Sequence, residues 1–498
     1  MQHKTGTARN QIQMSSLEDR IAKDNPVRVI DAFVDSLSLK EMGFKHAVIK
    51  TEGCPPYSPS VMLKLYMYGY SGGVRMRSSR RLEAECKRNV ELMWLIQEMT
   101  PSHMSIAKFR SDHAKELKKV FKSLGAFLKG IELIGGELVA IDGTKIRGVN
   151  SKGNNHTEKD VASYLHYLEE KSESYLKELD AADKQEASSG NNDLNVKQDE
   201  VKELLKKIEE KKKKYKGLQS QMEQQQSTQV STTDADTRLM QGADGGSIVG
   251  FNIQSATDAK HCLITDFAVT NEGDRHALHS VATSAKETLQ AGTLTVVADK
   301  GYHSGTELAA CEDADIVTLV ATQQYAVPNT VPDGRYNKEH FIYDKEQDCY
   351  SCPEGHKLES NGTKLKRTKL LGKEEVEVLY KDYKTTKCAD CPVRHLCTTA
   401  AKGRVISRFE YQETIDANNK RVEQNKEVYA RRKCIVEHPF GTVKRGWGYT
   451  YTLLKGIKKV TGEIALIFTS YNLRRAISIL GVVGLVEKIN NCTMGNAA

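Results

Sequence analysis

Apolar residues recur at helical spacing through the first 130 residues of the chain. PPYSPSVMLKLYMYGYSGG begins with turn residues and continues as an apolar helix. LEAECKRNVELMWLIQEM predicts one further amphipathic helix, and Pro101-Ser102 opens a break before SIAKFRSDHAKELKKVFKSL. Because arginine and lysine gather at the ends of these segments, residues 1–130 predict either a helical DNA-binding unit or a helical bundle with solvated cations.

The pattern changes to short apolar runs after residue 136. A helical pattern from Arg275 to Leu289 separates two groups of these runs. Strand character covers 136–147, 247–256, 261–270, 294–298 and 314–322. This order of strands and helices predicts an α/β fold with a mixed sheet flanked by helices.

Residues 157–226 predict an inserted helical hairpin. Two sets of apolar residues follow heptad-like spacing, and ASSGNNDLN between them supplies a turn. The sets are Val161, Leu165, Leu168, Tyr175 and Leu179, then Leu204, Ile208, Tyr215, Leu218 and Met222. The run KKIEEKKKKYK is basic, which favours a solvated helix face over a DNA contact. Further helices are predicted at 423–447 and 461–481.

Composition narrows the class of protein. A chain of 498 residues is too long for one simple core, so we expect two to four units. Hydrophobic residues make up 39% and charged residues 28%, as in soluble proteins, and the net charge of +8 weakly favours polyanions. No apolar run follows MQHKTGTARN, and Ile479–Val486 is too short to span a bilayer. We therefore expect a cytoplasmic protein with reduced cysteines and no membrane partner.

Three acids attract attention by their surroundings. Asp142 and Asp299 each end an apolar run and are followed within two residues by glycine. Glu437 is the only acid in RRKCIVEHPFGTVKRG. Singly, such an aspartate is more often a turn former, and such a glutamate a stray acid on a basic surface. Together, three carboxylates among cations can hold two divalent cations against a phosphate backbone, and Mg²⁺ prefers such oxygen ligands.

Cysteines form the second constellation. Cys349 and Cys352 make one C-x2-C pair, and Cys388 and Cys391 make another, with Cys397 and His395 nearby. Two such pairs can hold a structural zinc ion with four thiolates. The separation of 36 positions from Cys352 to Cys388 exceeds the usual spacing, so reduced structural cysteines are the alternative. No acyl-transfer triad, P-loop or dinucleotide fingerprint stands out.

Several blocks of the sequence resemble one family. IDGTKIRGVNSK, ADKGYHSG and VEHPFGTVKRG resemble the three catalytic blocks of bacterial insertion-sequence DDE transposases, in the branch with a Tyr-Arg-Glu-Lys signature. DADTRLMQGADGGSIVGFNIQSATDAKHCLI, CPEGHKLE, KCADCPVRHLC and the N-terminal PPYSPSVMLKLYMYGYSGG also resemble that family. The resemblance covers most of residues 25–480.

The resemblance implies both a fold and an activity. It implies an RNase H-like core in which Asp142, Asp299 and Glu437 are the catalytic, metal-binding triad for Mg²⁺, with Mn²⁺ as a substitute. It implies cleavage at transposon ends and transfer of the freed 3′-hydroxyl into target DNA. Terminal inverted repeats and target duplex are the expected partners of a homodimer associated with the nucleoid.

The same resemblance implies DNA-binding residues around Glu437. Lys444 matches the lysine of the signature, and two α-helical turns from Glu437 would put both on one face. Tyr429 and Arg432 lie one residue further from Glu437 than the signature requires, which rotates them by about 100°. Either Pro439 makes the helix irregular or Lys433 replaces the arginine. With Arg445, these residues form the expected DNA-contact set.

The expected domain plan follows from these blocks. It comprises a helical DNA-binding domain (1–130), the first part of the core (131–330), a zinc-ribbon-like insertion (331–405), helices that complete the core (406–485) and a tail (486–498). Two other functions stay open: a catalytically inactive or host-adopted DNA-binding protein on the same fold, and a zinc-dependent interaction scaffold. Cleavage and DNA-binding assays separate them.

Overall fold

The chain folds into two compact units. In the computed structural model the described residues are 3, 6–12, 14–48, 55–189, 193–224, 227–242, 245–322, 331–371 and 374–492. The first unit comprises Met1–Gly136, Asp142–Gly273 and Ile435–Ala498, and the second comprises Glu137–Ile141 and Asp274–Cys434. No helix among the described residues is long and apolar enough to cross a membrane.

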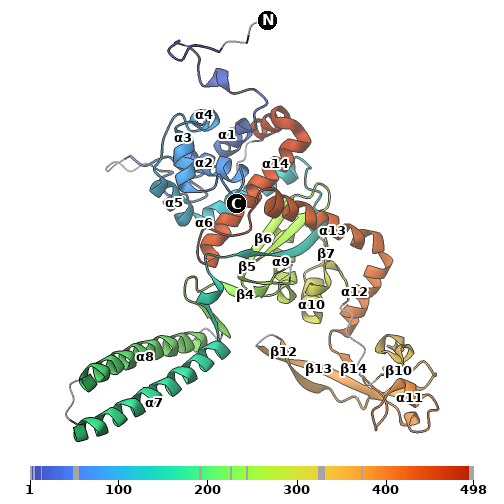
Figure 1. The fold of residues 1–498 in the computed structure, drawn as a ribbon. Helices are drawn as coiled ribbons and strands as arrows, with labels where there is room; N and C mark the ends of the chain where they lie inside the picture. The colour runs from blue at the N-terminus through green and yellow to red at the C-terminus, as the bar shows by residue number, and fades with distance from the viewer. Residues whose placement is uncertain are drawn as a thin grey trace. The chain divides into compact units, whose positions relative to one another are not determined.

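The N-terminal part of the first unit is helical, as predicted (Figure 1). The expected single helix over LEAECKRNVELMWLIQEM is wrong: the Asn89 side chain accepts the Glu91 and Leu92 amides and starts a new helix there. Ser58 and Ser102 cap other helices in the same way. The helices are η1 (Glu18–Arg20), α1 (Val27–Asp35), α2 (Pro59–Ser71), α3 (Ser79–Cys86), α4 (Val90–Leu95), α5 (His103–Asp112) and α6 (Ala114–Gly130).

The first unit also contains the antiparallel strands of the central sheet. Strand β5 (Ser247–Asp258) pairs with β4 (Arg238–Gln241) and with β6 (Ile264–Thr270). Helix α14 (Ile457–Asn491) contacts α6 and β6 and is buried on all sides over Ile464–Leu473, where most residues are apolar. Its predicted end at Gly481 is a kink with φ 72°, and the helix continues through 486–491 of the predicted tail.

The inserted hairpin forms as predicted (Figure 1). Helices α7 (Glu158–Ser189) and α8 (Asp193–Gln224) rise from a ribbon of β2 (Asn155–Thr157) and β3 (Gln229–Ser231), with η2 (Lys152–Asn154) just before β2. Tyr164 near the start of α7 packs against Tyr215 near the end of α8, with 4.4 Å between the ring centroids. The two helices are therefore antiparallel. Residues 190–192 of the predicted turn lie outside the described residues.

Strand β1 (Leu138–Arg147) begins in the second unit. There its first residues pair in parallel with β7 (Leu294–Ala298), which pairs in parallel with β8 (Ile316–Val320). The sheet order is β4-β5-β1-β7-β8 with β6 on β5, a mixed sheet consistent with an RNase H-like core. Short elements complete this region: η3 (Asp274–His276), α9 (Leu278–Thr288), η4 (Lys300–Tyr302) and α10 (Gly305–Asp313).

The cysteine-rich region of the second unit has a sheet of its own. Its described core is small: Phe341, Tyr350, Leu358, Tyr383 and Ile406 are buried together. The order is β12 (Leu365–Leu371), β13 (Glu374–Lys384), β11 (Lys357–Glu359), β10 (Cys349–Ser351) and β9 (Ile342–Asp344), with β14 (Val405–Phe409) beside β13. Helical turns flank it: η5 (Gly334–Tyr336), η6 (Lys338–His340), η7 (Thr386–Cys388) and α11 (Arg394–Cys397).

The helix predicted at 423–447 is replaced by three elements. Helix α12 (Gln412–Gln424) ends at Asn425, whose side-chain amide donates to the Arg421 carbonyl. Helix α13 (Lys426–Phe440) follows and includes Pro439. A π-helical turn, η8 (Gly441–Gly446), then leads toward α14. The predicted irregularity therefore follows Glu437 rather than preceding it.

Candidate active site and cysteine pocket

The two aspartates lie at different points of their strands. Asp299 follows β7, as predicted, and its side chain caps η4. Asp142 lies inside β1 instead of at its end, so that expectation is wrong. The strand continues because new partners replace β7: the Arg147 amide donates to the Thr450 carbonyl at 3.1 Å, and the Gly148 amide donates to the Val249 carbonyl at 3.0 Å.

The register of the parallel strands relates the two aspartates. Ile141 pairs with Ala298; Asp142 is the next residue of β1, and Asp299 directly follows the end of β7. Each carboxylate is oriented by a nearby amide: Asp142 Oδ1 accepts from Gly143 at 2.8 Å, and Asp299 Oδ1 accepts from Gly301 at 2.7 Å. Both side chains are half-buried, so solvent reaches them.

Glu437 is exposed on α13, and the residues on either side of it anchor the helix. Ile435 and Val436, which precede it, are buried. The following residue, His438, shares a 2.7 Å hydrogen bond between its Nδ1 and the Tyr471 hydroxyl. Burial lowers the pKa of His438, which favours its neutral form. His438 is thus engaged in packing α13, and Glu437 is presented to solvent.

Lys444 reaches back from η8 to β1. Its Nζ donates to Thr144 Oγ1 at 3.0 Å and to the Lys145 carbonyl at 3.2 Å. The cation is therefore held two to three residues beyond Asp142 on the same strand. The two-turn argument for Lys444 is wrong, because a π-helical turn with i→i+5 bonds follows Glu437.

Tyr429 interacts electrostatically with both Arg432 and Asp299 in the second unit. Burial raises the pKa of Tyr429, the Arg432 charge lowers it, and the negative charge of Asp299 raises it. Because α13 is continuous over Lys426–Phe440, no irregular turn ahead of Glu437 absorbs the one-residue offset. Lys433 and Arg445 are exposed.

A basic cleft opens beside Lys444 in the first unit. Its volume is about 860 Å³, and among the described residues its charged lining consists of Lys145, Arg147, Arg238, Lys444 and one acid, Glu272. Burial lowers the pKa of Arg238, although Asp236 and Asp234 oppose this effect. Lys145, Arg147 and Arg238 are not among the DNA-contact residues predicted from the sequence. The alternation of Lys145 and Arg147 on one strand face was the available signal.

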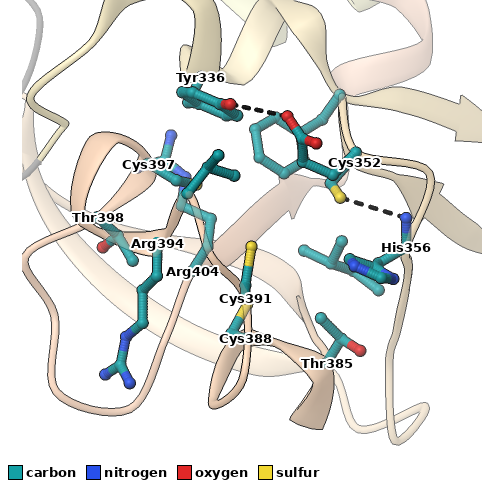
Figure 2. Close-up of a pocket in the computed structure, with 14 residues that line it drawn as sticks. Tyr336, Cys352, His356, Thr385, Cys388, Cys391, Arg394, Cys397, Thr398 and Arg404 are labelled. Atoms are coloured by element: carbon teal, nitrogen blue, oxygen red, sulfur yellow. Dashed lines mark hydrogen bonds between the residues drawn. The ribbon is translucent and has the colours of Figure 1, made fainter.

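The cysteines gather around a small pocket in the second unit (Figure 2). It measures about 30 Å³, and its sulfurs belong to Cys352, Cys388, Cys391 and Cys397. The His356 amide donates to Cys352 Sγ at 3.3 Å, and burial raises the pKa of the Cys397 thiol. Cys349 does not line this pocket: it is buried in β10. The pocket therefore includes Cys397 where the predicted zinc set has Cys349.

No preformed metal group accompanies these arrangements. Among the residues that the structure describes, no three histidine, cysteine, aspartate or glutamate side chains are grouped closely enough to hold a metal ion. The structure gives no support to a zinc set that includes Cys349.

The fold and the strand-borne acids together define a class of protein, that of mixed α/β proteins consistent with an RNase H-like core. Comparison with known families makes this more specific. Residues 15–112 match the family described as "Transposase domain (DUF772)", and residues 351–477 match "Transposase DDE domain". Over these two segments the chain is similar to DDE transposases, a class of enzyme whose domains imply DNA transposition. No curated protein and no solved structure matched the chain.

Proposed function

We propose that this protein cleaves DNA at the ends of a bacterial insertion sequence and joins the freed 3′-hydroxyl to target DNA. The match of residues 351–477 to the DDE domain carries the proposal, because this segment contains Glu437 and Lys444. The Tyr-Arg-Glu-Lys branch is proposed from the sequence blocks. The same blocks support a homodimer that holds two terminal inverted repeats.

Asp142, Asp299 and Glu437 are the proposed catalytic carboxylates. Their oxygen atoms are the donors that Mg²⁺ or Mn²⁺ prefers, and the class generally uses Mg²⁺. The amides that orient both aspartates support the use of each carboxylate as a ligand. When bound, the metal ions would activate the attacking oxygen and stabilise the leaving one.

Cations beside these acids have the matching role of binding the DNA backbone. Lys444 is fixed on β1 by Thr144 and the Lys145 carbonyl, so its ammonium can hold a phosphate without losing much freedom. Arg147 and Arg238 extend this positive charge along the cleft. Tyr429, Arg432, Lys433 and Arg445 complete the proposed DNA-contact set.

The chemistry consists of two displacements at phosphorus. In cleavage, a water oxygen attacks the phosphorus, the bond from phosphorus to the 3′-oxygen breaks, and the leaving oxygen ends as a 3′-hydroxyl. In joining, that 3′-hydroxyl attacks a phosphorus of target DNA and displaces another 3′-oxygen, while its proton passes to solvent. The protein's own contribution is to hold the phosphate and the reacting groups in line.

The domain plan belongs to the same proposal. Residues 1–130 would bind the element's ends, 131–330 and 406–485 would form the core, 331–405 would be the cysteine-rich insertion, and 486–498 a tail.

The activity is tested on the whole protein with DNA taken from both sides of its reading frame. Labelled duplexes are incubated with Mg²⁺ or with EDTA, and the products are resolved on denaturing gels. We expect cleavage only with the metal, and a loss of at least about 1,000-fold in the variants Asp142→Asn and Glu437→Gln.

Glu427→Gln provides the matched control, because Glu427 is another exposed glutamate of α13. It should cleave like the wild type. Cleavage that persists in Asp142→Asn or Glu437→Gln would refute the assigned roles. DNA binding without cleavage by the wild type would favour the inactive DNA-binding protein.

A further inference from the structure

A buried ion pair joins the N-terminal helices to the end of the chain. Arg77 Nη1 lies 3.0 Å from Glu463 Oε1, and the two side chains are 1% and 0% exposed. Such pairs contribute little net stability, since desolvation offsets their attraction. A positioning role would account for the pair where stability does not.

The partners of the pair point to that role. Glu463 accepts the amides of Leu453 and Leu454 at 2.9–3.1 Å. Arg77 Nη2 donates to the Tyr451 carbonyl at 2.7 Å, and its guanidinium lies over the Tyr451 ring at 4.5 Å. Arg77 and Glu463 thus hold one segment, Trp447–Leu454, which we name the crossing segment.

The N-terminal helical region secures the beginning of the same segment. The Val74 amide donates to the Trp447 carbonyl at 2.9 Å, and the Tyr449 hydroxyl donates to the Tyr70 carbonyl at 2.6 Å. Gly73 has φ +80°, and a Cβ there would lie 3.3 Å from the Trp447 oxygen. The positive φ therefore favours glycine at this position, and the close approach leaves little room for a Cβ.

The opposite edge of the crossing segment pairs with β1. Arg147 donates its amide to Thr450 and accepts the amide of Thr452 at 2.8 Å. The segment directly follows η8, whose Lys444 bonds to Thr144 and Lys145 on that strand. A displacement of the crossing segment would therefore move both Lys444 and the part of β1 that follows Asp142.

We infer that Arg77 and Glu463 are positioning residues, which couple the N-terminal helical region to the placement of Lys444 beside Asp142. The inference rests on the proposed function. A planar guanidinium suits this role, since its fork reaches a carboxylate and a carbonyl at once, whereas a lysine has one ammonium. The coupling acts through hydrogen bonds from both side chains to the backbone of the crossing segment, and neither residue needs to touch DNA.

The test compares Arg77→Met and Arg77→Lys with Lys64→Met. Lys64 is another buried cation of the helical region, bonded to Asp31 and Asp35 at 2.7 and 2.8 Å, with no described contact to the crossing segment. Hydrogen exchange of residues 443–454, melting curves, DNA affinity and the cleavage rate are measured on each full-length variant.

We expect Arg77→Met and Arg77→Lys to exchange faster across the crossing segment and to cleave at least about 10-fold more slowly, with affinity for flanking duplex within about 2-fold of wild type. Lys64→Met should lower the melting temperature without either change. Arg77→Lys keeps the buried charge and decides the matter if Arg77→Met does not fold.

Unchanged exchange in both Arg77 variants would overturn the inference, and so would equal losses in Lys64→Met. If the wild type does not cleave flanking DNA, the proposed function fails, yet the exchange measurement still decides whether Arg77 holds the segment. The two failures are therefore distinguishable.

Discussion

Replacing Arg147 and Arg238 by glutamine removes two of the four cations that line the basic cleft. Of the described residues, Lys145, Arg147, Arg238 and Lys444 line the cleft against one acid, so the formal charge of this described lining falls from +3 to +1. Glutamine keeps a polar side chain of similar length. Phosphate binding should therefore weaken through the loss of charge.

The size of the effect follows from counterion release. Each phosphate contact to duplex DNA contributes a slope of about −0.9 in a plot of log affinity against log salt. Losing two contacts should flatten the slope by about 1.8, which corresponds to roughly 60-fold weaker binding at 0.1 M salt and convergence with wild type near 1 M.

Fluorescence anisotropy with a labelled duplex of arbitrary sequence, titrated over a range of salt, measures this slope. The control removes the same charge from Arg335 and Lys345, which pair with Asp333 and Glu413 instead. An unchanged slope in the Arg147→Gln/Arg238→Gln variant, or an equal change in the control, would refute a DNA-binding role for the cleft.

Two further predictions concern stability. Gly250→Ala should cost about 1–3 kcal/mol or more in urea unfolding, because its Cβ would lie 2.1 Å from the Ile146 carbonyl oxygen. On α8 the comparison variant Gly217→Ala, whose Cβ would have open space, should stabilise the fold by up to about 1 kcal/mol. If both variants had the unfolding free energy of the wild type, the close β1–β5 approach would be disproved. In the cysteine-rich region, the pKa of Asp348 is lowered to about 2, and the hydrogen bond from Lys381 is the largest cause. The ionised Asp348 therefore stabilises the folded state. This stabilisation is complete above the ordinary aspartate pKa near 4 and lost as the pH falls through about 2. Asp348→Asn should flatten the acid limb of a fluorescence-monitored unfolding curve, and an unaltered limb would contradict the assignment.

Local patterns determined much of the fold. Heptad-like spacing predicted α7 and α8, and period-2 or continuous apolar runs predicted β5, β7 and β8 close to their observed bounds. These elements depend on residues a few positions apart, so they can be read along the chain. The structure departs from the prediction where a polar side chain binds backbone amides, as Asn89 does between α3 and α4.

The candidate site divides in the same way. The types of residue determined its chemistry: two aspartates after apolar runs, one glutamate among cations, and cysteines in C-x2-C pairs. The set of cysteines that lines the pocket differs from the set predicted from the sequence. Backbone pairing of β10 directs Cys349 into the interior, and α11 brings Cys397 to the pocket. Sequence proximity to a motif does not fix which sulfur faces a cavity.

The sequence by itself determined the helical N-terminal region, the mixed sheet, the inserted hairpin and the residues proposed for metal-dependent chemistry. Only the tertiary structure decided that β1 continues past Asp142, that Lys444 bonds to Thr144 across 300 positions, and that Arg77 pairs with Glu463 across 386. The physical reason is that such contacts join segments with no shared periodicity, and their partners become neighbours only when the whole core closes around them.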